Sequence, residues 1–377
     1  MSQSNPKSPN NVPDPNGVGQ KGDFLFGLPY TVEESELVIL PVPWDLTVSY
    51  GDGTRKGPQA VLDASSQLDL EDPVVSEAWT LPRQILPLDL RWQQRSKSER
   101  RWVESYLRWL ENGQNPEQAS EMMAGLQTAN EKCGYLLDWV RTQARHYRNL
   151  GKIVAILGGD HSTPLGLMEV LGQDLDSFGI LHIDAHMDLR NAYEGFDYSH
   201  ASIMFNALRI PSLSRLVQVG IRDYCPAEKE CAEQDERVTV WTDHALASAM
   251  HRGTLWHDLC LEIVKALPEQ VYISFDIDGL RPCYAPGTGT PVPGGLEYNQ
   301  ALHLLEVLYQ SGRRIVGFDL VEVAPSKGDR EWNGNVGARL LYRLSNLCLA
   351  SNRSALTRTK GRQAAPKTKN SNRKPKI

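Results

Sequence analysis

The sequence predicts an α/β protein of three layers (α-β-α), in which helices cover both faces of a central, mainly parallel β-sheet. Short apolar runs alternate with segments of helix length, and this alternation is typical of parallel strands joined by helical crossovers. After residue 150 the apolar runs occupy residues 153–157, 178–183, 216–219, 238–241, 271–275 and 315–320. A length of 377 residues with 41% hydrophobic and 23% charged residues allows one large, well-packed domain.

The chain before this region predicts an extension, a strand and a loop. Residues 1–22 are rich in Pro, Asn, Gly and Ser, so we expect a flexible N-terminal extension. The apolar run at residues 37–42 predicts the first strand. Residues 44–58 follow as a loop at the carboxyl end of that strand, where α/β proteins place substrate contacts.

Residues 91–150 predict a helical insertion. Apolar residues there recur three and four positions apart, as at Trp102, Tyr106 and Leu110, which indicates two or more amphipathic helices. We expect this insertion to belong to a single catalytic domain that spans residues 23–350.

The composition narrows the class of partner and the compartment. The net charge is −6 although residues 351–377 carry nine Lys or Arg and no acid, so the body of the chain is strongly acidic. Such a body suits a cationic substrate or metal ions better than nucleic acid, and we expect the basic segment to be a disordered tail. Six cysteines without a C-x-x-C pair predict reduced thiols. The sequence has neither a signal-peptide pattern nor an apolar run of the ~20 residues that span a bilayer, so we expect a cytoplasmic protein.

Three of the predicted strands end in residue types that bind metal ions. The motifs are GGDHS at 158–162, DAHMD at 184–188 and DID at 276–278. The carboxyl ends of parallel strands share one edge of a sheet, and residues two apart on an extended chain share a face. One such motif alone is usually a turn or a helix cap, but three at strand ends predict a common site. Six side chains can converge there: His161, Asp184, His186, Asp188, Asp276 and Asp278.

Four of these six side chains are carboxylates, and their burial is costly without positive charge. Two divalent cations would remove that cost. A set rich in oxygen with two imidazoles favours Mn²⁺, and Ni²⁺ is a second candidate. Because a pair of such ions lowers the pKa of a shared water molecule, the pattern predicts a hydrolytic site. His182 lies in an apolar run, and we interpret it as a core histidine.

The three motifs, read here as GGDHS, DAHMD and SFDIDGL, resemble those of the ureohydrolase superfamily of arginases and agmatinases. The resemblance covers roughly residues 37–345 in motif order and separation. It implies an arginase-like fold, release of urea from a guanidino compound, and a homotrimer or homohexamer. It also implies two ligand sets that share Asp184 and Asp276. The first set is His161, Asp184, Asp188 and Asp276, and the second is Asp184, His186, Asp276 and Asp278.

The resemblance also implies roles for residues outside the ligand sets. Asp188 would orient the attacking water as well as bind metal. His200 matches a histidine that carries protons to the leaving amine, a role suited to an imidazole whose pKa is near neutrality. Glu322 would pair with the planar guanidinium through charge-assisted hydrogen bonds. Thr290 matches a position that contacts the substrate, and Asp319 would support a ligand from behind.

The substrate is less firmly indicated than the reaction. The segment 196–202 (FDYSHAS) lacks the Ser-Gly-Asn-x-His-Gly pattern of arginases, so we expect a substrate other than arginine. Several segments look closer to a divergent agmatinase-like branch that includes hydrolases of free guanidine. Trp332 or Tyr193 could stack on such a planar cation. These features favour free guanidine, with agmatine or a guanidino acid such as guanidinobutyrate as alternatives.

Two alternatives belong to other classes of protein. A non-catalytic scaffold would be expected to lose some of the six ligand residues, and all six are present. A deacetylase on a related sheet would generally use one metal ion, so a stoichiometry of two ions per chain would exclude it.

Overall fold

The computed structural model describes residues 13–20, 22, 24–115 and 119–364. Its centre is one eight-stranded sheet in which every described strand pair is parallel. The strands lie in the order β2-β1-β3-β8-β7-β4-β5-β6. Their bounds are β1 Leu37–Val42, β2 Arg83–Ile85, β3 Ile153–Gly158, β4 Phe178–Ile183, β5 Leu213–Ile221, β6 Val238–Thr242, β7 Gln270–Asp276 and β8 Arg314–Val321.

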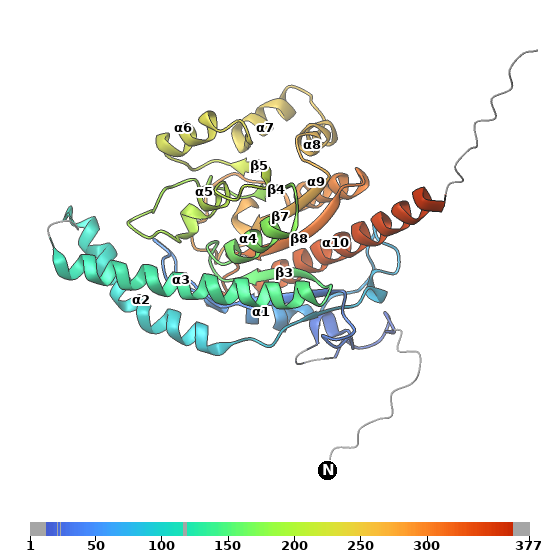
Figure 1. Cartoon of the computed structure of the whole chain (residues 1–377), viewed down its shortest axis with the longest axis horizontal. Helices are drawn as coiled ribbons and strands as arrows, with labels where there is room; N and C mark the ends of the chain where they lie inside the picture. Colours follow the sequence, from blue (N-terminus) through green and yellow to red (C-terminus); the bar gives the residue numbers. More distant parts are fainter. Residues whose placement is uncertain (1–12, 21, 23, 116–118, 365–377) are drawn as a thin grey trace, which may run out of the picture.

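Helices cover both faces of this sheet (Figure 1). Their bounds are α1 Gly57–Ser65, α2 Leu90–Glu111, α3 Ser120–Asn149, α4 Leu165–Asp174, α5 Ile203–Ala207, α6 Pro226–Gln234, α7 Asp243–His251, α8 Trp256–Lys265, α9 Tyr298–Gln310 and α10 Trp332–Ala364. Alternate residues of β1 enter different cores: Leu37 and Ile39 belong to the cluster that includes residues of α1, α8, α9 and α10, whereas Val38 and Leu40 belong to the cluster that includes residues of α2, α3 and α4. The predicted three-layer α/β fold is confirmed.

The structure describes part of each of the two expected terminal segments. Residues 13–20 contact the body of the protein, where Gln20 N donates to Gly27 O and Gly19 lies against the carbonyl of Ser66. Helix α10 continues through Ala364, so it extends into the segment that was expected to be a tail from residue 351. The rest of that tail, residues 365–377, lies outside the described residues, as do residues 1–12. Among the described residues, no helix is long and apolar enough to span a bilayer.

The expected helical insertion is a pair of long helices, α2 and α3, which lie beside each other along one side of the molecule (Figure 1). The short strand β2 was not among the predicted strands. It has the sequence RQI, so neither an apolar run nor an alternating pattern marks it.

Candidate active site

The site lies over the carboxyl ends of four neighbouring strands, β3, β8, β7 and β4. The GGDHS motif follows β3, the DAHMD motif follows β4, and the third motif begins at Asp276, the last residue of β7. Glu322 comes directly after β8. Residues more than 150 positions apart in the sequence therefore meet at one edge of the sheet.

Glycine allows the first motif to approach a neighbouring loop. Gly159 N donates to Val42 O at 2.8 Å, and Asp160 N donates to Trp44 O at 2.8 Å. A Cβ atom on Gly159 would lie only 1.9 Å from the carbonyl oxygen of Trp44. A side chain at this position would push His161 away from the strand ends.

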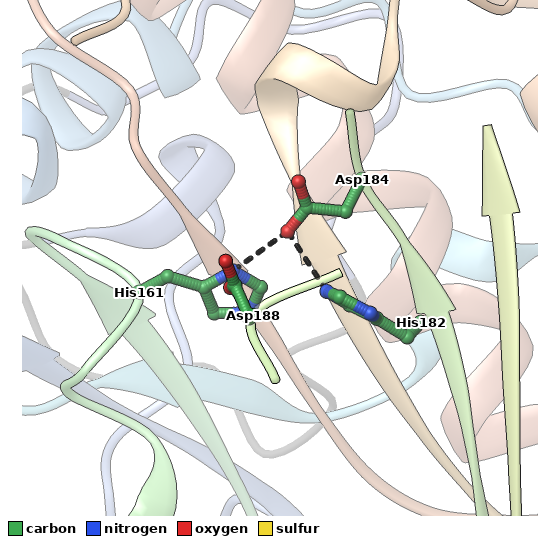
Figure 2. A group of neighbouring side chains, drawn as sticks. All are labelled: His161, His182, Asp184 and Asp188. Atoms are coloured by element: carbon green, nitrogen blue, oxygen red, sulfur yellow. Dashed lines mark hydrogen bonds and ion pairs between the residues drawn. The ribbon is translucent and has the colours of Figure 1, made fainter. Parts of the chain in front are cut away.

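His161 is the centre of the first group of candidate ligands. Its Nδ1 atom lies 3.0 Å from Asp184 Oδ2, 3.1 Å from Asp188 Oδ2 and 3.2 Å from Asp276 Oδ2. All four side chains are buried. Figure 2 shows the ring of His161 directed toward the carboxylate of Asp184, with Asp188 beside it.

His186 forms a second group around the other side of Asp184. Its Nδ1 atom lies 3.4 Å from Asp184 Oδ1 and 3.2 Å from Asp278 Oδ2. Thr290 Oγ1 donates to Asp278 Oδ2 at 3.3 Å. The two carboxylate oxygens of Asp184 thus face different histidines, and the structure brings all six expected ligands together.

His182 is a core histidine, as expected, but it also contacts the ligand cluster, which the sequence interpretation did not include. Its ring is fully buried, but Nε2 lies 2.8 Å from Asp184 Oδ2 and Gln218 Nε2 lies 2.9 Å from its Nδ1 atom. The reason is the period of the strand: His182 and Asp184 are two residues apart and therefore point to the same face. Figure 2 shows His182 directed at Asp184 from the strand side.

The carboxylates of this cluster compete for ionisation. Burial raises the pKa of Asp276 well above its usual value, and the neighbouring Asp278 and Asp184 raise it further. Burial likewise raises the pKa of Asp188 to about 6. Asp184 differs, because contacts with His182 and His161 outweigh its burial and hold its pKa well below the usual value. Positive charge is what allows all these carboxylates to be ionised at once.

The donor atoms fit bound cations. Nδ1 of His161 and Oδ2 of Asp188 are buried and have no hydrogen-bond partner among the described residues, although they lie 3.1 Å apart. Two acceptors that face each other without a proton donor between them are costly unless a cation binds both. The set of imidazole and carboxylate donors is one that Mn²⁺ and similar ions accept.

Further residues hold His161 from behind and from the side. Its Nε2 atom lies 2.9 Å from Ser274 Oγ, which donates to Asp319 Oδ1 at 3.1 Å. This arrangement agrees with the expected supporting role of Asp319. Glu322 Oε1 accepts the backbone N–H of His161 at 2.8 Å, and the backbone of Glu322 is left-handed, with φ 61°. Such backbone strain in a non-glycine residue is typical of functional sites.

A cavity of about 150 Å³ opens beside the cluster. Two expected ligands, His186 and Asp188, line it together with His200, Tyr193 and Thr290. Glu322 is not among its lining residues, since its carboxylate is turned toward His161. Of the residues expected to contact substrate or leaving group, the cavity collects Thr290, His200 and Tyr193, whereas Glu322 and Trp332 do not line it.

The other five lining residues are Ser49, Arg190, Ala201, Asp223 and Glu228. Ser49 lies in the loop where the sequence predicts substrate contacts, and none of the five was singled out from the sequence. The guanidinium of Arg190 lies over the ring of Tyr193, 4.4 Å from its centre, and 3.4 Å from Glu228. Their positions in the sequence could have predicted a place at the site. Arg190 lies two residues beyond Asp188, and Asp223 follows shortly after β5 at the same edge of the sheet.

The structure does not place Trp332 in this cavity. Trp332 begins α10, is 45% exposed, and its indole N–H donates to Cys283 O at 3.0 Å. The structure therefore gives no support to the predicted stacking of Trp332 on a substrate. The aromatic lining residue is Tyr193, on the loop that precedes His200.

His200 also departs from expectation in its acidity. Desolvation of its partly buried ring lowers its pKa to about 3. The ring is therefore neutral at neutral pH and can take up a proton during a reaction, rather than arriving with one.

Fold and cluster together define a class: an α/β enzyme with paired groups of His and Asp ligands at the carboxyl edge of a parallel sheet. Comparison with known sequences makes this more specific. A model described as the Arginase family matches residues 35–345. The N(1)-aminopropylagmatine ureohydrolase of Thermus thermophilus is 34% identical over 308 residues, which cover 80% of this chain and 88% of that protein. The agmatinase of Bacillus anthracis is 28% identical over 78% of this chain and 85% of its own length.

The chain belongs to the Arginase family and is a hydrolase acting on amidino C–N bonds. Solved structures agree in fold. The agmatine ureohydrolase of Thermoplasma volcanium has a TM-score of 0.64 at 23% identity, covering 90% of this chain and 97% of its own. The arginase of Bacillus subtilis has a TM-score of 0.57 at 21% identity, covering 82% and 98%.

Proposed function

We propose that this protein binds two divalent cations and hydrolyses a cationic guanidino compound to release urea. The observation that carries the proposal is that Asp184 presents one oxygen to His161 and the other to His186. The first ion would be held by His161, Asp184, Asp188 and Asp276, and the second by Asp184, His186, Asp276 and Asp278. Mn²⁺ is the first candidate and Ni²⁺ the second.

The side chains around the ions divide the remaining work. When bound, the ions supply the lowered pKa of a water molecule. Asp188 would orient that water as well as bind the first ion, as the family resemblance implies. Thr290 at the cavity wall would contact the guanidinium, and Glu322 would pair with it through Oε2, since Oε1 accepts the His161 N–H. The neutral ring of His200 accepts a proton and passes it to the leaving amine.

The lining charges favour a substrate with a second cationic group. Asp223 is an exposed carboxylate at the cavity, and its position suits an ammonium at the far end of the substrate from the guanidinium. The relatives named N(1)-aminopropylagmatine ureohydrolase and agmatinase support the same chemistry. We therefore propose agmatine or an N-alkylated agmatine as the substrate, with an amine as the second product.

Free guanidine is the second candidate. The cavity measures only about 150 Å³, and a planar cation without a tail would stack on Tyr193 only in place of the Arg190 guanidinium that lies there. Trp332 lies outside the cavity, so only one of the two aromatic side chains that favoured guanidine as the substrate lines it. A guanidino acid such as guanidinobutyrate would place its carboxylate near Asp223 and is less favoured.

A urea-release assay separates these substrates. Protein loaded with Mn²⁺ or Ni²⁺ is supplied with agmatine, N(1)-aminopropylagmatine, guanidine, arginine or guanidinobutyrate. We expect the highest kcat/KM with an amine-tailed compound, and Asp223→Asn should raise KM for that compound about tenfold while leaving guanidine unaffected. Activity on guanidine alone would select the second candidate, and no urea from any compound would refute the proposed function.

We further propose that the protein is a cytoplasmic homotrimer or homohexamer without membrane or nucleic-acid partners, as the family resemblance implies. Light scattering after size exclusion would measure the mass directly. A monomer at micromolar concentration would contradict this assembly.

A further inference from the structure

Helix α2 holds the loop of residues 44–55, which borders the cavity. The buried guanidinium of Arg100 donates to Leu46 O at 3.0 Å and also to Val48 O. One turn earlier, Ser96 Oγ donates to Asp45 Oδ1 at 2.7 Å and accepts from Asp45 N at 3.1 Å. The loop is thus tied to a single face of α2.

Asp45 continues this connection into the loop itself. Its second oxygen, Oδ2, accepts from Gly53 N at 2.9 Å and Arg55 N at 3.2 Å, and it pairs with the Arg55 guanidinium at 2.9 Å. Gln93 on α2 donates to Arg55 O at 3.2 Å. These bonds fix both ends of the segment that carries Ser49 to the cavity wall.

The same helix pair holds a second loop, residues 190–200, through different contacts. Tyr106 on α2 donates its hydroxyl to Glu194 O at 3.0 Å. On α3, Asn130 Nδ2 donates to Gly195 O at 2.9 Å, and Asn130 Oδ1 accepts from Asp197 N at 3.0 Å. This loop carries Arg190, Tyr193 and His200 to the cavity.

The two loops therefore form walls of one cavity and are both tied to α2 and α3, far from them in sequence. The first loop also touches the segment that carries Thr290, since Gly51 N donates to Gly289 O at 3.2 Å. Within the described residues, the hydrogen bonds of Arg100 and Asn130 go to these loops and to none of the six proposed metal ligands.

We propose that α2 and α3 act as a brace that sets the shape of the substrate cavity, with Arg100 and Asn130 as positioning residues. The inference rests on the proposed function for its kinetic consequence. Without Arg100 two carbonyl groups in a buried loop lose their donor, and without Asn130 a carbonyl and an amide of the second loop lose their partners. Both loops then sample positions in which Ser49, Tyr193 and His200 no longer match the substrate.

Two variants with matched controls test the brace. Arg100→Ala is compared with Arg101→Ala, because Arg101 is the exposed neighbour on α2. Asn130→Ala is compared with Gln127→Ala, whose side chain is exposed on α3 and bonds only Glu131 in the described structure. Arg100→Lys keeps a cationic donor and serves as a partial rescue.

Three measurements are made on the metal-loaded, full-length protein. We expect hydrogen exchange to accelerate in residues 44–55 for Arg100→Ala and in residues 192–198 for Asn130→Ala, while residues 158–162 and 276–279 stay protected. We expect KM to rise about tenfold, with kcat and metal content within about twofold of wild type. Arg100→Lys should recover part of the loss in KM, and both controls should match wild type.

The outcomes separate this inference from the proposed function. The brace would be overturned if hydrogen exchange in the two loops were unchanged in both variants. It would also be overturned if the variants had the same exchange rates and KM values as their controls. Loss of bound metal in step with the rise in KM would also overturn it, because it would make the effect a general loss of structure. If wild type releases no urea from any compound, the proposed function fails, and the exchange pattern still decides whether the helices hold the loops.

Discussion

Asp184 is the residue on which the cluster depends most. Its oxygens lie near His161, His182 and His186, and one of them also accepts the backbone N–H of His186 at 2.6 Å. Asparagine at this position keeps the shape but replaces one charged oxygen by an NH₂ donor that repels a cation. The residue therefore couples the two proposed metal sites electrostatically.

We expect Asp184→Asn to lose most bound metal and to lower the rate of urea release by more than about 100-fold. Metal per chain is measured by elemental analysis beside the rate. Asp197→Asn, at an exposed carboxylate outside the cluster, is the control and should retain both. Urea release by Asp184→Asn at the wild-type rate would show that the site is wrongly assigned.

His200 predicts a dependence of stability on pH. Its pKa falls from the usual value of 6.5 to about 3 in the folded protein, chiefly because the partly buried ring is desolvated. As the pH drops below about 6.5, the unfolded chain binds a proton that the folded protein does not, so the free energy of unfolding decreases. His200→Asn removes this titration.

The expected result is that wild type loses more stability than His200→Asn between pH 7.5 and about pH 5. Urea denaturation at both pH values, on protein in the same metal state, measures the two differences. Equal losses in the two proteins would mean that His200 is protonated in the folded protein as easily as in the unfolded chain.

At the scale of elements, the connection between β3 and α4 shows how tightly the site is built. Gly159 lies against the carbonyl of Trp44. Its N–H donates to Val42 O at the end of β1, and the N–H of Asp160 donates to Trp44 O, so the pairing of β3 continues beyond the end of β1. The close approach brings the loop after β1 and the GGDHS motif to the same edge. Gly134 on α3 offers a contrast, since open space surrounds it.

We expect Gly159→Ala to lower the free energy of unfolding by about 1–3 kcal/mol, because the new methyl group overlaps a backbone carbonyl. Gly134→Ala should instead raise the free energy of unfolding by about 0.5–1 kcal/mol, since alanine has the higher helix propensity and its Cβ atom would meet no other atom within 4 Å. Denaturant unfolding of both variants provides the comparison. A stable Gly159→Ala protein would mean that the loop at Trp44 can move without cost.

At the scale of the whole molecule, the proposed ions link the site to the stability of the sheet. Four strands bring carboxylates to one edge, and in the absence of positive charge these groups repel one another. An ion that binds only the folded chain stabilises it by mass action. The ends of β3, β8, β7 and β4 should therefore be held together more firmly in the loaded protein.

Removing the metal with a chelator is expected to lower Tm by roughly 5 °C, and adding Mn²⁺ should restore it. Thermal unfolding with and without chelator measures the change. Asp184→Asn is the control and should be insensitive to both treatments. An identical Tm for loaded and metal-free wild type would contradict the proposed binding.

The sequence by itself determined the fold class and the meeting of the six ligands. Apolar runs separated by helices allow few arrangements other than a parallel sheet, and the carboxyl ends of parallel strands share one edge. Asp184 and Asp276 therefore had to approach each other once both followed such strands. The alternation of side chains along β4 could also have predicted the contact of His182 with Asp184, because the two residues are two positions apart. The apolar neighbours of His182 favoured its interpretation as a core histidine instead.

Only the tertiary structure decided what surrounds the ligands. The exposure of Trp332, the contact of Arg190 with Tyr193 and the bonds from Arg100 and Asn130 to the two loops depend on how helices cross the sheet. Hydrophobic periodicity fixes which face of a helix is buried, but it leaves open which distant loop that face meets. Such contacts between segments far apart in sequence arise from packing of the whole domain.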